Sequence, residues 1–177
     1  MHPTLRQETP ADYPLVHSLI ERAFRHDPHS DHREQFLVRA LREAATFIPE
    51  LSLVAELNQA IVGYILFTPI TIDHAQTRIP SLALAPVCVA PDFQRQGIGS
   101  ALIETGHRIA TDLGYTTVIV LGHKDYYPRF GYERCVDHQI TMPFAVADDY
   151  CMVKELTPGA LTHIHGSVTY PKAFLGA

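Results

Sequence analysis

The chemistry-bearing segment of this chain is Gln94-Arg95-Gln96-Gly97-Ile98-Gly99. An apolar, β-branched run ends just before it, at Val89, and an amphipathic run from Ser100 to Leu113 follows, so a turn between a strand and a helix is predicted. The two glycines carry no Cβ, which lets the backbone N–H groups of the turn approach a ligand closely. N–H groups at a helix start also lie at the positive end of the helix dipole. The turn therefore suits a phosphate group, and Arg95 adds a mobile cation.

Several kinds of phosphate-binding turn share this physics. A dinucleotide-binding G-x-G-x-x-G turn needs a third glycine where this chain has Leu102, and a P-loop needs Gly-Lys-Ser/Thr, which is absent. The remaining Q/R-x-x-G-x-G pattern resembles the pyrophosphate-binding turn of the GNAT superfamily of acyl-CoA-dependent N-acetyltransferases. The alternative interpretation of these six residues is an ordinary glycine-rich turn.

A second motif lies one helix and one strand further along the chain. The β-branched run Thr116 to Leu121 is followed by a segment that ends in Tyr126-Tyr127-Pro128-Arg129-Phe130-Gly131-Tyr132. The segment resembles the Y-x-x-x-G-F/Y motif of GNAT enzymes, whose tyrosine is commonly the general acid. Tyr127 stands four residues before Gly131 and matches that tyrosine. Tyr126 is the rival, because adjacent side chains on a helix point about 100 degrees apart.

The resemblance also implies which residues bind the cosubstrate, acetyl-CoA. In the GNAT pattern, the backbone of the strand before the turn pairs with the pantetheine arm as another strand would. The matching residues are Val87, Cys88 and Val89, and the phosphates are expected on Arg95, Gln96, Gly97, Ile98, Gly99 and Ser100. One contact is not carried over, because Val120-Leu121-Gly122-His123 stands where many GNAT chains have Asn-x-x-Ala. The tail segment Gly166 to Phe174 resembles that of a bacterial branch of predicted N-acetyltransferases.

The implied reaction is direct attack of a primary amine on the acetyl thioester in a ternary complex. The departing thiolate, with a pKa near ~8.5, is helped by a donor, and the resemblance gives this role to Tyr127. No carboxylate lies on the strand from Ser81 to Val89, so we expect the amine proton to leave through water; His123 and Asp125 could equally cap a short helix. The alternative function is a non-catalytic acyl-CoA-binding sensor or scaffold.

The resemblance places the connection between the first two helices, Arg25 to Glu34, beside the acceptor site. It contains the acidic residues Asp27, Asp31 and Glu34, whose charge favours a cationic amine of a small molecule or peptide. His26, His29 and His32 recur here every three residues, and His163 and His165 form a second pair, but Pro28 interrupts the first set. No metal site is therefore predicted.

Composition narrows the class of protein. The chain has 177 residues, 46% of them hydrophobic and 19% charged, as in ordinary globular proteins of one domain. The net charge of −5 and the lack of a Lys/Arg cluster argue against nucleic acid as a partner. No run reaches the ~20 apolar residues of a membrane helix, and the N-terminus does not read as a signal peptide, so a cytoplasmic location is expected.

Periodicity predicts an α+β (α/β) chain. The expected strands are 4–8, 51–57, 61–72, 81–89, 116–121, 135–141 and 150–156, with helices over 10–24, 33–44 and 100–113 and a polar loop over 73–80. The order matches a GNAT fold, which implies a mixed central sheet splayed between strands four and five and flanked by helices. Residues 1–177 are predicted to form one domain, in which 157–177 are an extended tail that packs on the sheet or on a second copy in a homodimer.

Overall fold

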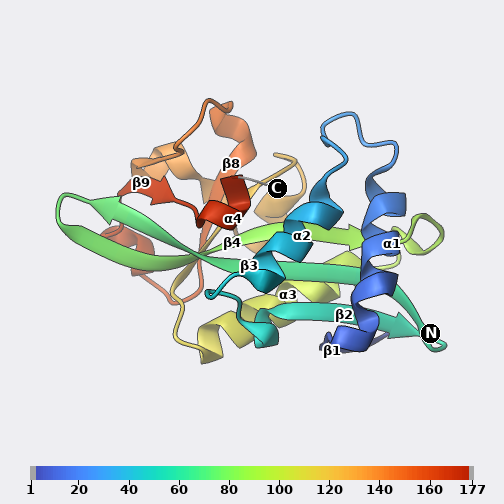
Figure 1. The fold of residues 1–177 in the computed structure, drawn as a ribbon. Helices are drawn as coiled ribbons and strands as arrows, with labels where there is room; N and C mark the ends of the chain where they lie inside the picture. Colours follow the sequence, from blue (N-terminus) through green and yellow to red (C-terminus); the bar gives the residue numbers. More distant parts are fainter. Residues whose placement is uncertain (1–2, 176–177) are drawn as a thin grey trace.

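A mixed β-sheet runs through the computed structural model, which describes residues 3–175 (Figure 1). Within that range the strand order is β1-β2-β3-β4-β5-β8-β6, while β9 pairs with β3 and with β7. The strands are β1 (Thr4–Gln7), β2 (Ser52–Leu57), β3 (Ala60–His74), β4 (Thr77–Val89), β5 (Thr117–Leu121), β6 (Glu133–Arg134), β7 (Ile140–Thr141), β8 (Cys151–Glu155) and β9 (Gly166–Thr169). Pairing is antiparallel except for β4 with β5 and β7 with β9.

Helices cover both faces of the sheet. They are α1 (Tyr13–Phe24), α2 (Glu34–Glu43), α3 (Ile98–Asp112) and α4 (Lys172–Leu175). α1 packs against β3 and β4 on one face, with α2 beside α1 and α4 beside α2, and α3 packs against β2, β3 and β4 on the other (Figure 1).

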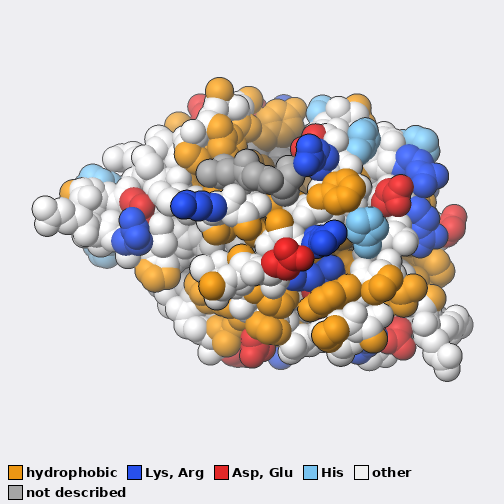
Figure 2. All heavy atoms as spheres, in the orientation of Figure 1, with side chains coloured by type: hydrophobic (Ala, Val, Ile, Leu, Met, Phe, Trp, Pro, Cys, Tyr) orange, Lys and Arg blue, Asp and Glu red, His pale blue; other side chains and the backbone are white. Residues whose placement is uncertain are grey.

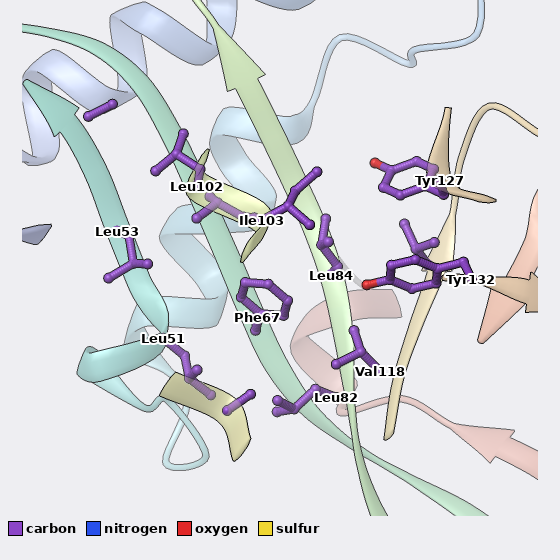
Figure 3. Packing of buried hydrophobic residues seen from close by; sticks show 14 of the residues in the cluster. Leu51, Leu53, Phe67, Leu82, Leu84, Leu102, Ile103, Val118, Tyr127 and Tyr132 are labelled. Carbon is purple, nitrogen blue, oxygen red and sulfur yellow. The ribbon is translucent and has the colours of Figure 1, made fainter. Parts of the chain in front are cut away.

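Alternation of side chains along the strands explains the two layers. Tyr64 and Leu66 of β3 are fully buried beneath α1 and α2, whereas Ile65 and Phe67 are fully buried on the α3 side. Figure 3 shows Phe67 between Leu82 of β4 and the α3 residues Leu102 and Ile103. Gly106 of α3 permits this contact, because a Cβ there would lie 2.1 Å from the Phe67 ring.

The sheet opens between β4 and β5. Their parallel pairing covers only Leu82 with Val118, Ala83 with Ile119 and Leu84 with Val120. Beyond Leu84, the pairing of β4 with β3 is interrupted opposite Leu66 by an irregularity that contains Pro86. β4 then continues to Val89, and β3 is its one described partner there. The predicted mixed sheet, splayed between strands four and five and flanked by helices, is confirmed.

In three segments the structure differs from what the sequence predicts. Residues 73–80 are not a loop, since β3 and β4 extend to His74 and from Thr77 in a long hairpin. The expected strand 135–141 is instead a 3₁₀ helix, Cys135–His138, followed by the two residues of β7. The tail contains the short helix α4, and its β9 pairs with Thr71, Ile72 and Asp73 of β3. The pairing of β9 with β3 and the packing of α4 against α2 hold the tail in place. Neither contact can be predicted from the periodicity of neighbouring residues.

Candidate active site

A cleft of about 1150 Å³ occupies the place where the sheet opens. Its walls are the end of β4, the turn before α3, the connection between α1 and α2, and the segment after β5. Elements far apart in the sequence therefore meet at one point, and almost every predicted site residue lies in one of these walls.

The first wall is the edge of β4. Val87, Cys88 and Val89 all line the cleft. Their side chains alternate as predicted, with Cys88 packed among the α1 and α2 residues and the two valines against the α3 cluster. Burial raises the pKa of the Cys88 thiol to about 12, so it remains a neutral, packed side chain. Because β4 pairs with no other described strand on this side beyond Leu84, the backbone groups of 85–88 that point away from β3 are left free for a ligand. The Val89 carbonyl accepts a hydrogen bond from the side-chain amide of Gln94 at 3.2 Å.

The second wall is the turn before α3. Gly97 has a φ of 84° and precedes the first residue of α3, Ile98, while Arg95 has a φ of 61°. Of the predicted phosphate-binding residues, Arg95, Gly97, Ile98, Gly99 and Ser100 line the cleft. Gln96 does not line it, and its side-chain amide donates to the Asp92 carbonyl at 3.4 Å. The turn thus brings free helix N–H groups and a cation to one end of the cleft, which is an arrangement that suits an anion.

Two adjacent tyrosines form the wall opposite β4. Tyr127 starts a 3₁₀ helix (Tyr127–Phe130) and is 6% exposed, and its hydroxyl makes no hydrogen bond to another described residue. Gly122 makes room for it, since a Cβ there would lie 2.2 Å from the Tyr127 ring. Burial raises the pKa of Tyr127 well above its usual range, so the phenol keeps its proton at neutral pH.

Tyr126 lies nearer the end of the cleft formed by the turn before α3. Its hydroxyl is 3.1 Å from the position that a Cβ on Gly99 would take, in the first turn of α3. The guanidinium of Arg129 stacks on the Tyr126 ring at 3.8 Å and also lines the cleft. The two tyrosines therefore face the same cleft from neighbouring positions, and Arg129 adds a second cation that the sequence motifs did not single out.

Tyr127 packs against Tyr132, which is buried and hydrogen-bonded to His107. Tyr132 packs against it with ring centroids 5.5 Å apart and hydrogen-bonds to Nε2 of His107 at 2.8 Å. In Figure 3 the hydroxyl groups of Tyr127 and Tyr132 both point toward the side of β4 that carries Leu84. Burial, and secondarily the charge of Lys154, lowers the pKa of His107 to about 4, so this imidazole is neutral.

Polar residues from the α1–α2 connection and from the segment after β5 line the remaining end of the cleft. His29 and His123 face one another across it, with ring centroids 5.8 Å apart. Of the three predicted acidic residues, Asp27 and Glu34 line the cleft and Asp31 does not. His26, His32 and Asp125 also lie outside it. Tyr150, just before β8, lines this end as well, and no local sequence motif marks it.

The described residues 3–175 contain no group of three or more His, Cys, Asp or Glu side chains arranged to hold a metal ion. Nor does any helix in that range have the length and apolarity needed to cross a membrane. On the face that Figure 2 shows, basic, acidic and histidine side chains are intermixed over α1 and the α1–α2 connection. This face carries no continuous area of one charge.

Comparison with known proteins places this fold and cleft in a family. A family model described as an acetyltransferase (GNAT) domain matches residues 49–134, which span β2 to β6. The chain is 37% identical over 134 residues to the uncharacterized N-acetyltransferase YjhQ of Escherichia coli K12, covering 73% of this chain and 74% of that protein. It is 29% identical over 171 residues to the uncharacterized N-acetyltransferase YhbS of the same strain, covering 96% and 97% of the two chains.

Solved structures of GNAT acetyltransferases also match this chain. The crystal structure of Escherichia coli YhbS in complex with CoA matches with a TM-score of 0.89 and 27% identity, over 99% of this chain and 93% of that one. A GNAT acetyltransferase from Brucella melitensis in complex with acetyl-CoA matches with a TM-score of 0.80 and 31% identity, over 98% of both chains. The fold and cleft are thus those of an acyltransferase. The chain belongs to the GNAT family of N-acetyltransferases.

Proposed function

We propose that this protein transfers the acetyl group of acetyl-CoA directly to a primary amine of a small molecule or peptide, within a ternary complex. The observation that carries the proposal is the cleft itself. It joins a free strand edge, a helix N-terminus with two nearby arginines, and two tyrosines. Relatives crystallised with CoA and with acetyl-CoA support acetyl-CoA as the cosubstrate.

The cleft fits an acyl-CoA molecule in size and chemistry. Its volume of about 1150 Å³ is somewhat above the range of ~300–1,000 Å³ for small-molecule sites, as a long cosubstrate plus an acceptor requires. The amides of the pantetheine arm would pair with the open edge of Val87 to Val89. Its phosphates would lie against the N–H groups of residues 97–100, with Arg95 and Arg129 as counter-charges.

Tyr127 is proposed to assist the leaving group. Acetyl-CoA supplies the activated acetyl thioester, and the amine nitrogen bonds to the acetyl carbon as the carbon–sulfur bond breaks. The Tyr127 hydroxyl has no protein acceptor among the described residues and lines the cleft, so it is free to donate to the departing sulfur. Because burial raises the pKa of Tyr127 above that of a thiol, hydrogen-bond donation is favoured over early, complete proton transfer.

Thiol release from acetyl-CoA across a panel of amines tests the proposed activity. The panel contains cadaverine, spermidine, 2-phenylethylamine, lysine, glutamate, an aminoglycoside and a dipeptide with a free N-terminus. We expect amine-dependent thiol release with at least one of these acceptors, with the acetylated amine confirmed by mass spectrometry. Tight binding of acetyl-CoA with no thiol release above the amine-free rate would instead support the sensor or scaffold function.

A further inference from the structure

We propose that His29 and His123 form a bridge across the mouth of the cleft, and that this bridge restricts the acceptor to small free amines. The inference rests on the proposed acetyl transfer and narrows its acceptor class. It excludes amines carried by longer polypeptides, whether at the N-terminus or on a lysine side chain. The two histidines are 94 positions apart in the sequence (123 − 29), so no local motif predicts their contact.

The contact between the two imidazole rings joins opposite walls of the cleft. His29 belongs to the α1–α2 connection and His123 to the segment after β5, and both line the cleft. Their ring centroids are 5.8 Å apart and their planes meet at 74°, which is an edge-to-face arrangement. Rings at this separation touch, so no third group fits between them.

The bridge lies where the cleft opens to solvent. Both histidine side chains are exposed, although both also line the cleft, so the contact has solvent on one side and the cleft on the other. The backbone N–H of Tyr126 donates to the His123 carbonyl at 3.0 Å, which places one end of the bridge beside the two tyrosines. The bridge therefore narrows the way from solvent to Tyr127.

Hydrogen bonds to the end of α1 hold His29 in place. The backbone N–H of Asp27 donates to the Phe24 carbonyl at 3.1 Å, and the backbone N–H of His29 donates to Asp27 Oδ1 at 2.9 Å. On the other side of His29, the imidazole Nδ1 of His32 lies 2.9 Å from the same Phe24 carbonyl oxygen. Phe24 packs in the cluster beneath α1 and α2, so the turn that carries His29 is anchored to the core.

His123 is held from the other side of the cleft. The preceding residue, Gly122, donates its backbone N–H to the Tyr150 carbonyl at 2.9 Å, and the His123 carbonyl accepts from Tyr126. Each half of the bridge is thus carried by a backbone segment that is hydrogen-bonded on both sides. Widening the mouth requires that a ring turn aside or that one of these segments lose hydrogen bonds.

The separation of the rings decides which acceptors can enter. An extended peptide segment needs about 10 Å between the walls that flank it, which is twice the ~4.8 Å spacing of paired strands. The rings are 5.8 Å apart, so a polypeptide cannot lie across the mouth between them. A small amine such as cadaverine or 2-phenylethylamine has a free end and can enter beside the bridge. Steric exclusion of the larger acceptor is a common source of specificity.

Competing small-amine and peptide acceptors test the bridge. The small amines are cadaverine and 2-phenylethylamine. The peptides are a hexapeptide with a free N-terminus and no lysine, and a hexapeptide with a blocked N-terminus and one central lysine. For wild-type protein, kcat/KM for the better small amine should exceed that for either peptide by ~10²-fold or more.

Substitution of either histidine should admit the peptides. His29→Ala and His123→Ala should each shrink the ratio of small-amine to peptide kcat/KM by ~10-fold, with the affinity for CoA measured by calorimetry unchanged. Both positions are exposed, so the unfolding temperature should stay that of wild type. Two matched controls should keep the wild-type ratio. His26→Ala is in the same connection and Lys124→Ala is next to His123, and both residues are exposed and lie outside the cleft.

Combining the two substitutions separates the bridge from two independent contributions. If the rings act through their mutual contact, removing either one opens it, so His29→Ala/His123→Ala should shrink the ratio little more than each single substitution. A double-variant effect equal to the product of the single effects overturns the bridge. An unchanged ratio in both single variants overturns it as well.

The bridge and the proposed transfer fail in different ways. If wild-type protein releases no thiol with any amine in the panel, the proposed transfer fails and the role of the bridge fails with it. If wild-type protein acetylates the hexapeptides as efficiently as cadaverine, acetyl transfer stands and the restricted acceptor class is overturned.

Discussion

Acidification should destabilise this protein through one buried imidazole, that of His107 in α3. The side chain is 8% exposed, packs edge-on against Phe67 with ring centroids 6.0 Å apart, and hydrogen-bonds to Tyr132. Its pKa is lowered to about 4 in the folded chain, against an ordinary value of 6.5. Between these values the unfolded chain binds a proton that the folded chain does not, so stability falls as the pH falls.

The magnitude follows from the two pKa values. Proton linkage with 6.5 for the unfolded state and about 4 for the folded state removes ~2 kcal/mol between pH 8 and pH 5, and ~3 kcal/mol by pH 4. This is a large part of the ~5–15 kcal/mol stability of a typical domain. The effect is absent above pH 7.5, where the imidazole is neutral in both states.

Urea unfolding at pH 8, 6.5 and 5, for wild type and His107→Gln, measures this contribution. Glutamine can still hydrogen-bond to the Tyr132 hydroxyl but does not titrate. The variant has lower stability at pH 8 because it loses ring packing, yet it should lose ~2 kcal/mol less than wild type on going to pH 5. His163→Gln, at an exposed position, should follow wild type. Parallel pH dependences for wild type and His107→Gln would refute the argument.

Three other substitutions test the site and its support. Gly99→Glu places a carboxylate at the phosphate-binding end of the cleft, so CoA binding measured by calorimetry should be lost with the fold intact by circular dichroism; Thr111→Glu, near the other end of α3, should bind normally. Tyr127→Phe should lower kcat by ~10²-fold with unchanged CoA affinity and Tyr126→Phe should do less, and the reverse order would assign the donor to Tyr126. Arg42→Met breaks the buried pair with Glu8 (2.6 Å) and should cost ~3–5 kcal/mol in denaturant unfolding, whereas Arg39→Met, which removes an exposed pair on the same helix, should cost under ~0.5 kcal/mol. Equal costs for the last two variants would contradict the reasoning from burial.

Local patterns predicted the residues in the half of the cleft that we propose binds the cosubstrate. The turn from Arg95 to Ser100 is short and contiguous. The positive φ at position 97 is one that glycine adopts readily, so the residue type itself indicates this backbone conformation. The alternation of Val87, Cys88 and Val89 follows from strand geometry alone. These features depend on near neighbours, which is why a motif can represent them.

The other half, proposed to hold the acceptor, could not be predicted in the same way. In the sequence, Asp27, His29 and Glu34 belong to a mixed, polar stretch, and they line the cleft only because the fold brings the α1–α2 connection and the end of β4 to the same place. Residues 73–80 read as a loop because the hairpin they form has polar side chains on both faces. Its pairing partners, Asp73 with Arg78 and His74 with Thr77, lie across the turn, and no apolar period of two marks them.

The packing of α4 beside α2 has a consequence for the order in which the molecule assembles. The two helices are 129 residues apart in sequence (172 − 43), while the antiparallel strands β2, β3 and β4 follow one another directly. Contacts between distant segments form late, because the loop that joins them must first close. During refolding, pulse-labelled amides of β3 and β4 should be protected before those of α2. The part of the cleft formed by the α1–α2 connection would then be completed last, after the edge of β4 that is proposed to bind the cosubstrate.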